Sequence, residues 1–305
     1  MERENVEIYG RKERTLKRKE ILEKKKVTDG LIKAASSLKD PLALFPDFLH
    51  YNQQGLSLCL EGGHGDKLSR SLKQYVQKLL KLNMERHYGT EWPTEEKVKY
   101  REMVAPEAHY IFVYEVPTLT SNKEKRLTPT IEHKGDVAGF VHYRFILEEE
   151  LPVLYVYELQ LEQRIQGKGL GKFLMQLLEL IAHKNCMAAI LLTVQKSNLS
   201  AMFFYTSKLG YCISSISPSR VDPKVGLGKN YEILCKAFDQ EAKTNLEVLL
   251  PSKLYFFMLA CCANTFLTNS QTQTSTNVTR CGDLIGVCPG HCEDSACTLS
   301  GHVLL

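Results

Sequence analysis

Three glycines at alternate positions, Gly167, Gly169 and Gly171, lie in the short segment QGKGLGK at residues 166–172. Glycine tolerates sharply turned backbone conformations, so main-chain N–H groups in such a segment can converge on an anion. If a helix begins there, its unpaired N–H groups and the positive end of its dipole favour the same anion. The segment therefore predicts a pyrophosphate site, and a strand-to-helix turn without a ligand is the alternative.

Two common phosphate motifs do not fit this segment. A P-loop has four residues between its glycines and continues with Lys and then Ser or Thr, and neither feature is present. A Rossmann fingerprint has the spacing Gly-x-Gly-x-x-Gly, whereas these glycines stand two residues apart. The sequence therefore excludes both patterns.

Glu158, eight residues before the segment, is the candidate proton acceptor. It stands between apolar and aromatic residues in YVYEL at residues 155–159. Burial raises the pKa of a carboxyl group and brings it closer to that of a general base working at neutral pH. The alternative is a strand-edge glutamate paired with a lysine or an arginine. We favour the base because the glycine segment follows so closely.

Hydrophobic periodicity predicts the elements that position these residues. Residues 153–161 are rich in aliphatic and aromatic side chains, which is typical of a strand. After the glycines, apolar residues recur at helical spacing: Leu170, Phe173, Leu174, Leu177, Leu178 and Ile181. We expect further strands at 109–115, 137–146, 188–194, 211–216 and 230–236, and helices at 68–88 and 198–209. Antiparallel strands followed by a strand–helix–strand order predict an α/β fold, with a mixed central sheet flanked by helices.

Composition and charge divide the chain into three parts. The 305 residues are 44% hydrophobic and 24% charged, as in ordinary globular proteins, and the net charge is only +4. Residues 1–38 form a basic arm, because residues 11–26 hold nine Lys or Arg against three Glu. Such an arm is either a solvated helix, a nuclear-import signal or a segment that contacts nucleic acid. Residues 39–238 are the expected catalytic domain.

The remaining residues, 239–305, are expected to be a disordered, cysteine-rich tail. The apolar stretch at 249–267 is too interrupted to span a membrane. The cysteines and histidine at 281–297 lack the paired spacing of zinc sites, so we expect no metal. No N-terminal apolar segment resembles a signal peptide, so the ten cysteines are expected to be intracellular thiols.

The glycine segment resembles the cofactor motif of the GNAT acetyltransferases, Gln/Arg-x-x-Gly-x-Gly/Ala after a strand. Over residues 39–236 the chain is similar to one branch of that superfamily, the NatD-type N-alpha-acetyltransferases. The shared motifs are KDPLALFPDF (39–48), NMERHYGTEW (83–92), HYRF (142–145), VLYVYELQLE (153–162), GKGLGKFLMQ (167–176), LTVQKSN (192–198), SPS (217–219) and NYEIL (230–234). The resemblance implies a GNAT fold and the transfer of acetyl from acetyl-CoA to the free N-terminal amine of histone H4 and histone 2A. It also implies action without an auxiliary subunit in nucleus and cytoplasm, with no membrane and no direct readout of nucleic acid.

The resemblance also implies roles for individual residues. Glu158 would be the catalytic base, taking a proton from the amine through water. The cofactor would be held by Leu159, Gln160, Leu161, Gln166, Gly167, Lys168, Gly169, Leu170, Gly171, Lys172 and Asn198. The peptide would be held by Tyr88, Trp92, Glu148, Tyr157, Thr193 and Tyr231.

One position departs from the branch, and two other functions stay open. Ile146 stands where the similar enzymes carry an acidic residue facing the substrate, and Glu149 or Glu150 is the candidate substitute. The same cofactor could serve another acceptor, such as a lysine side chain or a polyamine. The fold could also be a histone-binding module without turnover, although the intact glycines and Glu158 argue against this.

Overall fold

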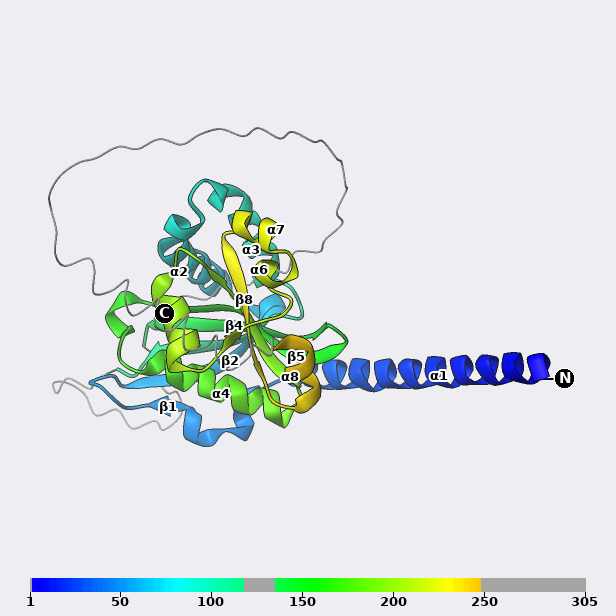
Figure 1. Ribbon diagram of the computed structural model, residues 1–305. Coiled ribbons are helices and arrows are strands. Elements are labelled where there is room, and N and C mark those ends of the chain that lie inside the picture. The colour runs from blue at the N-terminus through cyan, green and yellow to red at the C-terminus, as the bar shows by residue number, and fades with distance from the viewer. Residues whose placement is uncertain (1, 118–134, 248–305) are drawn as a thin grey trace, which may run out of the picture. The chain divides into compact units, whose positions relative to one another are not determined.

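The computed structural model describes residues 2–117 and 135–247, with side chains from Thr15 onward (Figure 1). Most of the polar, proline-containing segment at 116–134 lies outside the described residues. The same holds for most of the expected tail, including its apolar stretch and its cysteine-rich cluster.

Eight strands form one sheet in the described part of the chain, in the order β1-β2-β3-β4-β5-β6-β8-β7. The strands are β1 (His50–Tyr51), β2 (Leu58–His64), β3 (His109–Glu115), β4 (Val137–Glu148), β5 (Leu151–Leu161), β6 (Ala189–Gln195), β7 (Cys212–Ile213) and β8 (Tyr231–Ala237). All neighbours are antiparallel except β5 and β6. A parallel pair needs a crossover, which α4 (Leu170–Lys184) supplies. The mixed sheet expected from the sequence is confirmed.

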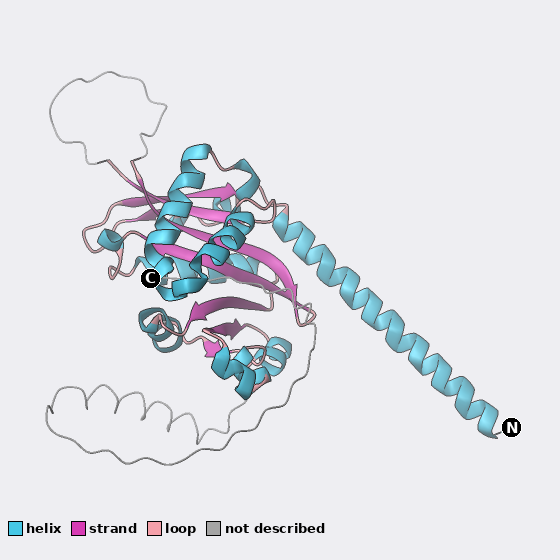
Figure 2. Ribbon diagram, turned by 90° about the horizontal axis from the view of Figure 1, so that it is seen from above, coloured by secondary structure: helices cyan, strands magenta, loops and turns pink. Residues whose placement is uncertain are grey.

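Helices cover both faces of this sheet, as the cyan helices and magenta strands of Figure 2 show. The other α-helices are α1 (Glu2–Ser36), α2 (Arg70–Tyr88), α3 (Trp92–Met103), α5 (Leu199–Phe203), α6 (Pro218–Val221), α7 (Pro223–Gly228) and α8 (Gln240–Leu246). Short 3-10 turns are η1 (Pro41–Leu44), η2 (Pro46–Phe48), η3 (Gly65–Lys67), η4 (Gly89–Glu91) and η5 (Gln163–Ile165), and η6 (Phe204–Lys208) is a π-helical turn. The apolar stripe of α4 packs on one face with the end of α1 and with α5 and η6. Residues of α2 and α3, and separately of α8, pack on the other face.

Among the side chains that the structure describes in α1, those of its last part contribute to the core. Ala35 is buried, and Leu31 and Ile32 pack beside it. Four apolar residues earlier in the helix form a sparse stripe and are between 56% and 66% exposed: Leu16, Ile21, Leu22 and Val27. The basic arm is therefore a continuous helix with a solvated apolar stripe. Among the described residues, no helix is long and apolar enough to cross a membrane.

Several elements differ from the sequence expectation. The strands β2 and β7 are affected in opposite ways: β2 was not expected, because two glycines interrupt its pattern, and β7 spans two residues instead of the six at 211–216. The helix expected at 198–209 is α5 followed by the π turn η6. The helices α3, α6 and α7 were not expected either, since their apolar periodicity is weak. The folded structure also continues past residue 238, because α8 buries Ala242 and Leu246.

Candidate active site

The sheet opens between β5 and β6 directly before the glycine segment. These parallel strands are paired only where residues 153–156 face residues 189–192. Beyond that point β5 runs on to Leu161 and keeps its partner β4 on the other side. The edge of residues 157–161 that faces β6 is therefore open to a ligand chain that hydrogen-bonds as an added strand. The expected cofactor residues Leu159, Gln160 and Leu161 lie on this edge.

The glycine segment forms the turn that the sequence predicts. Gly167 and Gly169 have left-handed backbones, with φ of +69° and +80°. Gly169 caps α4 without any side-chain hydrogen bond, so the first N–H groups of this helix face outward unpaired. The Tyr51 hydroxyl donates to the Lys168 carbonyl at 2.5 Å and fixes the turn from β1. The result is a main-chain anion cradle at the end of the open strand edge.

A β-bulge in β5 directs Glu158 away from the α4 side of the sheet. Tyr157 is an extra residue in β5, because the register with β4 shifts by one residue there. Val156 packs in the core on the α4 side, and so does Leu159, an odd number of positions later. The bulge restores the alternation between them, so that Tyr157 and Glu158 both project from the face that α2 and α3 cover.

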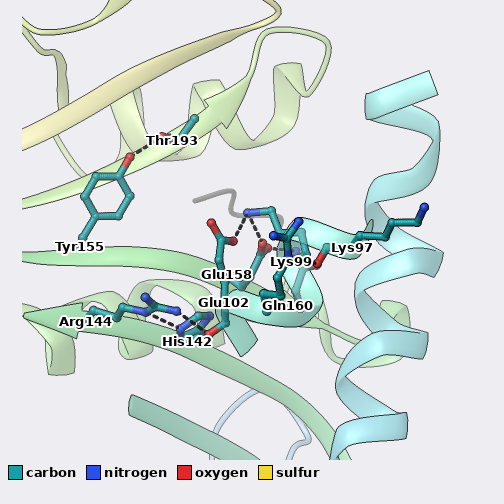
Figure 3. A network of polar contacts seen from close by, with 10 residues as sticks. Lys97, Lys99, Glu102, His142, Arg144, Tyr155, Glu158, Gln160 and Thr193 are labelled. Atoms are coloured by element: carbon teal, nitrogen blue, oxygen red, sulfur yellow. Dashed lines mark hydrogen bonds and ion pairs between the residues drawn. The ribbon is translucent and has the colours of Figure 1, made fainter. Parts of the chain in front are cut away.

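Glu158 is buried on that face, with only 3% of its surface exposed, and it has two polar partners (Figure 3). Gln160 Nε2 donates to Oε2 at 2.9 Å. The ammonium of Lys99, from α3, lies 3.1 Å from Oε1 of Glu158. The same ammonium lies 3.2 Å from Oε2 of Glu102. Burial raises the pKa of Glu158 to about 7, although the charge of Lys99 and the Gln160 hydrogen bond oppose this shift. Glu158 thus has the lysine partner of our alternative, but on a central strand, with a pKa suited to proton transfer.

Aromatic side chains surround this carboxylate. Tyr157 stacks on His142 at 4.8 Å between ring centroids, and the guanidinium of Arg144 lies 4.5 Å over the Tyr157 ring. Burial lowers the pKa of His142 well below its usual range, so this ring stays neutral. Tyr88 and Trp92, at the junction of α2 and α3, form a buried pair 5.6 Å apart. The charge of Glu158 contributes to raising the pKa of Tyr88, after burial, which indicates that the two are neighbours.

The other expected peptide-site residues lie at different distances from Glu158. Thr193 is buried, and its hydroxyl shares a 2.5 Å hydrogen bond with the hydroxyl of Tyr155. Tyr155 lies two residues before Tyr157 on β5. Tyr231 is half-buried at the start of β8. Glu148 is the last residue of β4 and pairs with Leu151 at the start of β5, which lies about 20 Å along the strand from Glu158.

The hairpin at that far end carries the acidic run. Glu149 and Glu150 form its two-residue turn, and both have left-handed backbones. Burial raises the pKa of Glu148, and the neighbouring charge of Glu149 adds to this effect. Ile146 is half-buried and packs on the apolar cluster of β5 rather than facing solvent as a charged residue would.

Two buried polar atoms lack a partner and are available to a ligand. Asn198 caps α5 by accepting from the Ala201 N–H at 3.2 Å, and its Nδ2 has no hydrogen-bond partner among the described residues. The hydroxyl of Tyr205, from η6, is likewise buried without a partner there. Its pKa is raised by burial and by the charge of Glu158, so the phenol stays protonated. Among the described residues no group of His, Cys, Asp or Glu side chains could hold a metal ion.

Sequence reasoning missed Lys99, Glu102 and Tyr205. Lys99 and Glu102 share one face of α3 at a spacing of three, but this helix was not expected, and lysine is rarely buried. Tyr205 was inside an expected helix, with no sign that its hydroxyl would be buried without a hydrogen-bond partner among the described residues. A buried lysine can be found only once the fold brings α3 against β5.

The comparison with protein families decides the fold family. The family model described as "Acetyltransferase (GNAT) family" matches residues 78–211, which include the second half of α2, the open strand edge, the glycine turn and η6. The chain contains a GNAT acetyltransferase domain. The GNAT domain confirms the fold class, and it bears out acetyl transfer as the reaction class and acetyl-CoA as the cosubstrate that we expected.

Solved structures resemble this GNAT domain at low identity. One is the PaiA N-acetyltransferase of Thermoplasma acidophilum in complex with coenzyme A, at 15% identity and a TM-score of 0.39, covering 59% of this chain and 99% of that one. Another is Arabidopsis thaliana Naa50 with the bisubstrate analogue CoA-Ac-MVNAL, at 17% identity and a TM-score of 0.37, covering 59% and 99%. At such values no residue role follows from either structure.

Proposed function

We propose that the GNAT domain transfers acetyl from acetyl-CoA to the free N-terminal α-amine of histone H4 and histone 2A by direct attack, with Glu158 as the general base. One observation carries this proposal: a buried carboxylate whose pKa is raised to about 7 lies beside an open strand edge that ends in a main-chain anion cradle. The bound thioester would supply an activated acetyl group. The cradle would hold the pyrophosphate, and the open edge at Leu159–Leu161 would pair with the pantetheine arm.

Protons move between residues that are already in place. Glu158 would accept the proton of the attacking amine, directly or through one water, which is typically worth about 10²–10⁴-fold in rate. The buried Tyr205 hydroxyl would stabilise the departing thiolate by donating a hydrogen bond to it, and would keep its own proton. No nucleophilic side chain is needed for direct transfer.

The raised pKa of Glu158 favours an α-amine over a lysine as acceptor. A protein α-ammonium has a reference pKa near 8, whereas that of a lysine side chain is about 10.4. A base with a pKa of about 7 therefore faces a smaller uphill proton transfer from the α-ammonium, by about two units. A site walled by Tyr88, Trp92 and Tyr157 also suits a thin peptide end better than a lysine within a chain.

The choice of histone tails rests on the resemblance to the NatD branch and on charge. A cationic tail beginning Ser-Gly-Arg-Gly would be attracted to the acidic turn at Glu148–Glu150. Enzymes of this branch act in nucleus and cytoplasm without an auxiliary subunit, and we propose the same here. The helical basic arm is compatible with a nuclear-import signal.

The test is mass spectrometry of a Ser-Gly-Arg-Gly peptide incubated with the full chain and acetyl-CoA, beside a copy with a blocked N-terminus. We expect one added acetyl group, on the free-amine peptide only. Modification of both peptides would move the reaction to lysine. No modification of either, with acetyl-CoA still bound, would favour another acceptor or a binding module.

A matched glycine pair tests the cofactor cradle separately. Gly169 and Gly210 both have left-handed backbones. A Cβ added at Gly169 would lie 2.9 Å from the Tyr51 hydroxyl, whereas a Cβ added at Gly210 would meet no atom of the described residues within 4 Å. Gly169→Ala should weaken coenzyme A binding by at least about tenfold, and Gly210→Ala should leave it unchanged while costing a similar backbone strain of about 1 kcal/mol. Isothermal titration calorimetry with coenzyme A would measure both. Equal losses in the two variants would remove the cradle from the binding site.

A further inference from the structure

A buried lysine links the candidate base to a second carboxylate. Lys99 is 3% exposed, and its Nζ lies within 3.2 Å of both Glu158 and Glu102 (Figure 3). Figure 3 shows the ammonium between the two carboxylates, with α3 supplying Lys99 and Glu102 and β5 supplying Glu158. The three groups form one buried charge cluster, which we call the Lys99 cluster.

Such a cluster is a poor way to stabilise a fold. Removing an ammonium and two carboxylates from water costs several kcal/mol per ion, and a well-packed apolar set of similar volume is often as stable or more so. Two carboxylates against one ammonium also leave a net negative charge when all three groups are ionised. A cluster like this is more readily explained by what it does to Glu158.

We propose that Lys99 is the positioning residue of the general base: it fixes the Glu158 carboxylate through Oε1 and, together with Glu102, sets how tightly that carboxylate holds a proton. The inference rests on the proposed role of Glu158 and deepens it. Gln160 fixes the other oxygen from the same strand. The two anchors together leave the carboxylate a single orientation.

Glu102 has a definite position of its own. Arg144 of β4 donates to the Glu102 carbonyl at 2.5 Å, so the end of α3 is tied to the strand that carries His142 and lies beside β5. Lys99 therefore reaches Glu158 on β5 from a helix whose end is also hydrogen-bonded to β4.

Opposite signs make the cluster testable. The positive charge of Lys99 lowers the pKa of Glu158, and the negative charge of Glu102 raises it, while burial is the dominant cause of the upward shift. The other titratable or charged groups near the cluster come from α2, α3, β3, β4 and η6: Tyr88, Glu95, Tyr110, His142, Arg144 and Tyr205. Burial keeps the tyrosines protonated and His142 neutral, and burial also raises the pKa of Glu95. Arg144 and Glu95 are therefore the remaining charged groups, and none of the variants below replaces either.

The first experiment is the pH profile of kcat/KM for peptide acetylation by the full chain. The acid limb reports the proton affinity of the free base. Lys99→Met should move this limb upward by about one to three pH units, and Glu102→Gln should move it downward by about one unit. Lys99→Arg should lie near the native profile, because the charge is kept. Lys97→Met, at an exposed position of the same helix, is the matched control and should move nothing.

The second experiment needs no acetyl acceptor. Infrared titration of the carboxylic acid band, taken as the difference between the native chain and its Glu158→Gln variant, measures protonation of Glu158 directly. The same opposite displacements are expected in the Lys99→Met and Glu102→Gln backgrounds. If these displacements appear and no peptide is acetylated, the role of Lys99 stands and the proposed function fails.

Two results would overturn the proposed role of Lys99. An unmoved Glu158 titration in both variants would make the Lys99 cluster a structural ion pair. If Lys99→Met does not fold, Glu102→Gln decides alone, because the Glu102 side chain is less deeply buried than that of Lys99 (15% against 3% exposed). A general loss of packing would also lower the pKa of Glu158, so the free energy of unfolding of Glu102→Gln is measured beside its titration and should stay close to native. An upward or absent displacement in Glu102→Gln would reject the proposal.

Discussion

Two buried glutamates of the same sheet have different surroundings. Glu232, on β8, is 7% exposed and accepts hydrogen bonds from the hydroxyls of Ser217 and Ser219 at 2.5 and 2.6 Å, with the Lys196 ammonium 3.2 Å from its other oxygen. Glu158, on β5, has one amide donor and one ammonium, and it shares that ammonium with a second carboxylate. Both are buried and both have a lysine, so burial and pairing do not distinguish them.

The difference lies in the balance of charges and donors. Glu232 and Lys196 form a pair of one charge each, and two hydroxyls complete the hydrogen bonds of the carboxylate. The Lys99 cluster has an excess carboxylate and one donor fewer, which leaves Glu158 able to accept a proton near neutral pH. A buried carboxylate with a full set of hydrogen-bond donors and one balancing charge holds loops together. A buried carboxylate with fewer donors and an excess of negative charge beside it is available for proton transfer.

Turnover should separate the two glutamates most. Glu158→Gln should lower kcat by about 10²–10⁴-fold, the usual worth of a general base, with coenzyme A affinity within about twofold of native. Glu232→Gln should stay within about threefold in kcat, because this carboxylate contacts no group that moves a proton. Steady-state kinetics and calorimetry on both variants would check this. Parallel loss of turnover and cofactor binding in Glu158→Gln would make Glu158 structural.

Stability should show the reverse order. Glu232→Ala leaves a buried hydroxyl (Ser217), a half-buried hydroxyl (Ser219) and a half-buried ammonium (Lys196) without their acceptor. We therefore expect a loss of about 2–4 kcal/mol in the free energy of unfolding. Urea denaturation followed by circular dichroism would measure it. A loss under about 0.5 kcal/mol would mean that Glu232 is no more structural than a surface residue, and the comparison would fail.

The sequence predicted the local part of the site and missed its long-range part. The strand, the glycine turn and the helix from residue 153 to 184 depend on neighbouring residues, and periodicity predicts such elements well. Glu158 stood out because a charge inside an apolar strand is unusual. Its orientation could not be predicted, since the bulge at Tyr157 is a matter of register with β4.

Partners from distant segments were equally out of reach. Lys99 reaches Glu158 from a helix of weak apolar periodicity. In such a helix a lysine is normally expected to be exposed to solvent. The SPS motif at residues 217–219 was part of the resemblance, but the sequence indicated no role for it. In the structure both of its serines donate hydrogen bonds to Glu232. Such contacts depend on the tertiary fold, which a local pattern does not encode.

The pH dependence of turnover should follow Glu158 alone. A base must be deprotonated to act, and the pKa of Glu158 is raised to about 7, so kcat/KM should fall about tenfold per pH unit below that value. Glu232→Gln should keep this acid limb, whereas Glu158→Gln should flatten what activity is left. Rate measurements between about pH 5.5 and 8.5 would test it. A limb that moves in Glu232→Gln would show that the two carboxylates are coupled.

The smallest effect expected is that of one hydroxyl. Ser217 is fully buried, donates to Glu232 and accepts from the Ile233 N–H at 2.9 Å, so Ser217→Ala removes two hydrogen bonds at once. We expect a loss of about 1–2 kcal/mol in the free energy of unfolding. Ser215→Ala is the matched control, because the Ser215 hydroxyl donates to the Asn245 carbonyl at an exposed position and should cost less than about 0.5 kcal/mol. Equal losses would mean that the hydroxyls around Glu232 do not saturate it. Its likeness to Glu158 would then be closer than the structure indicates, because both carboxylates would lack donors.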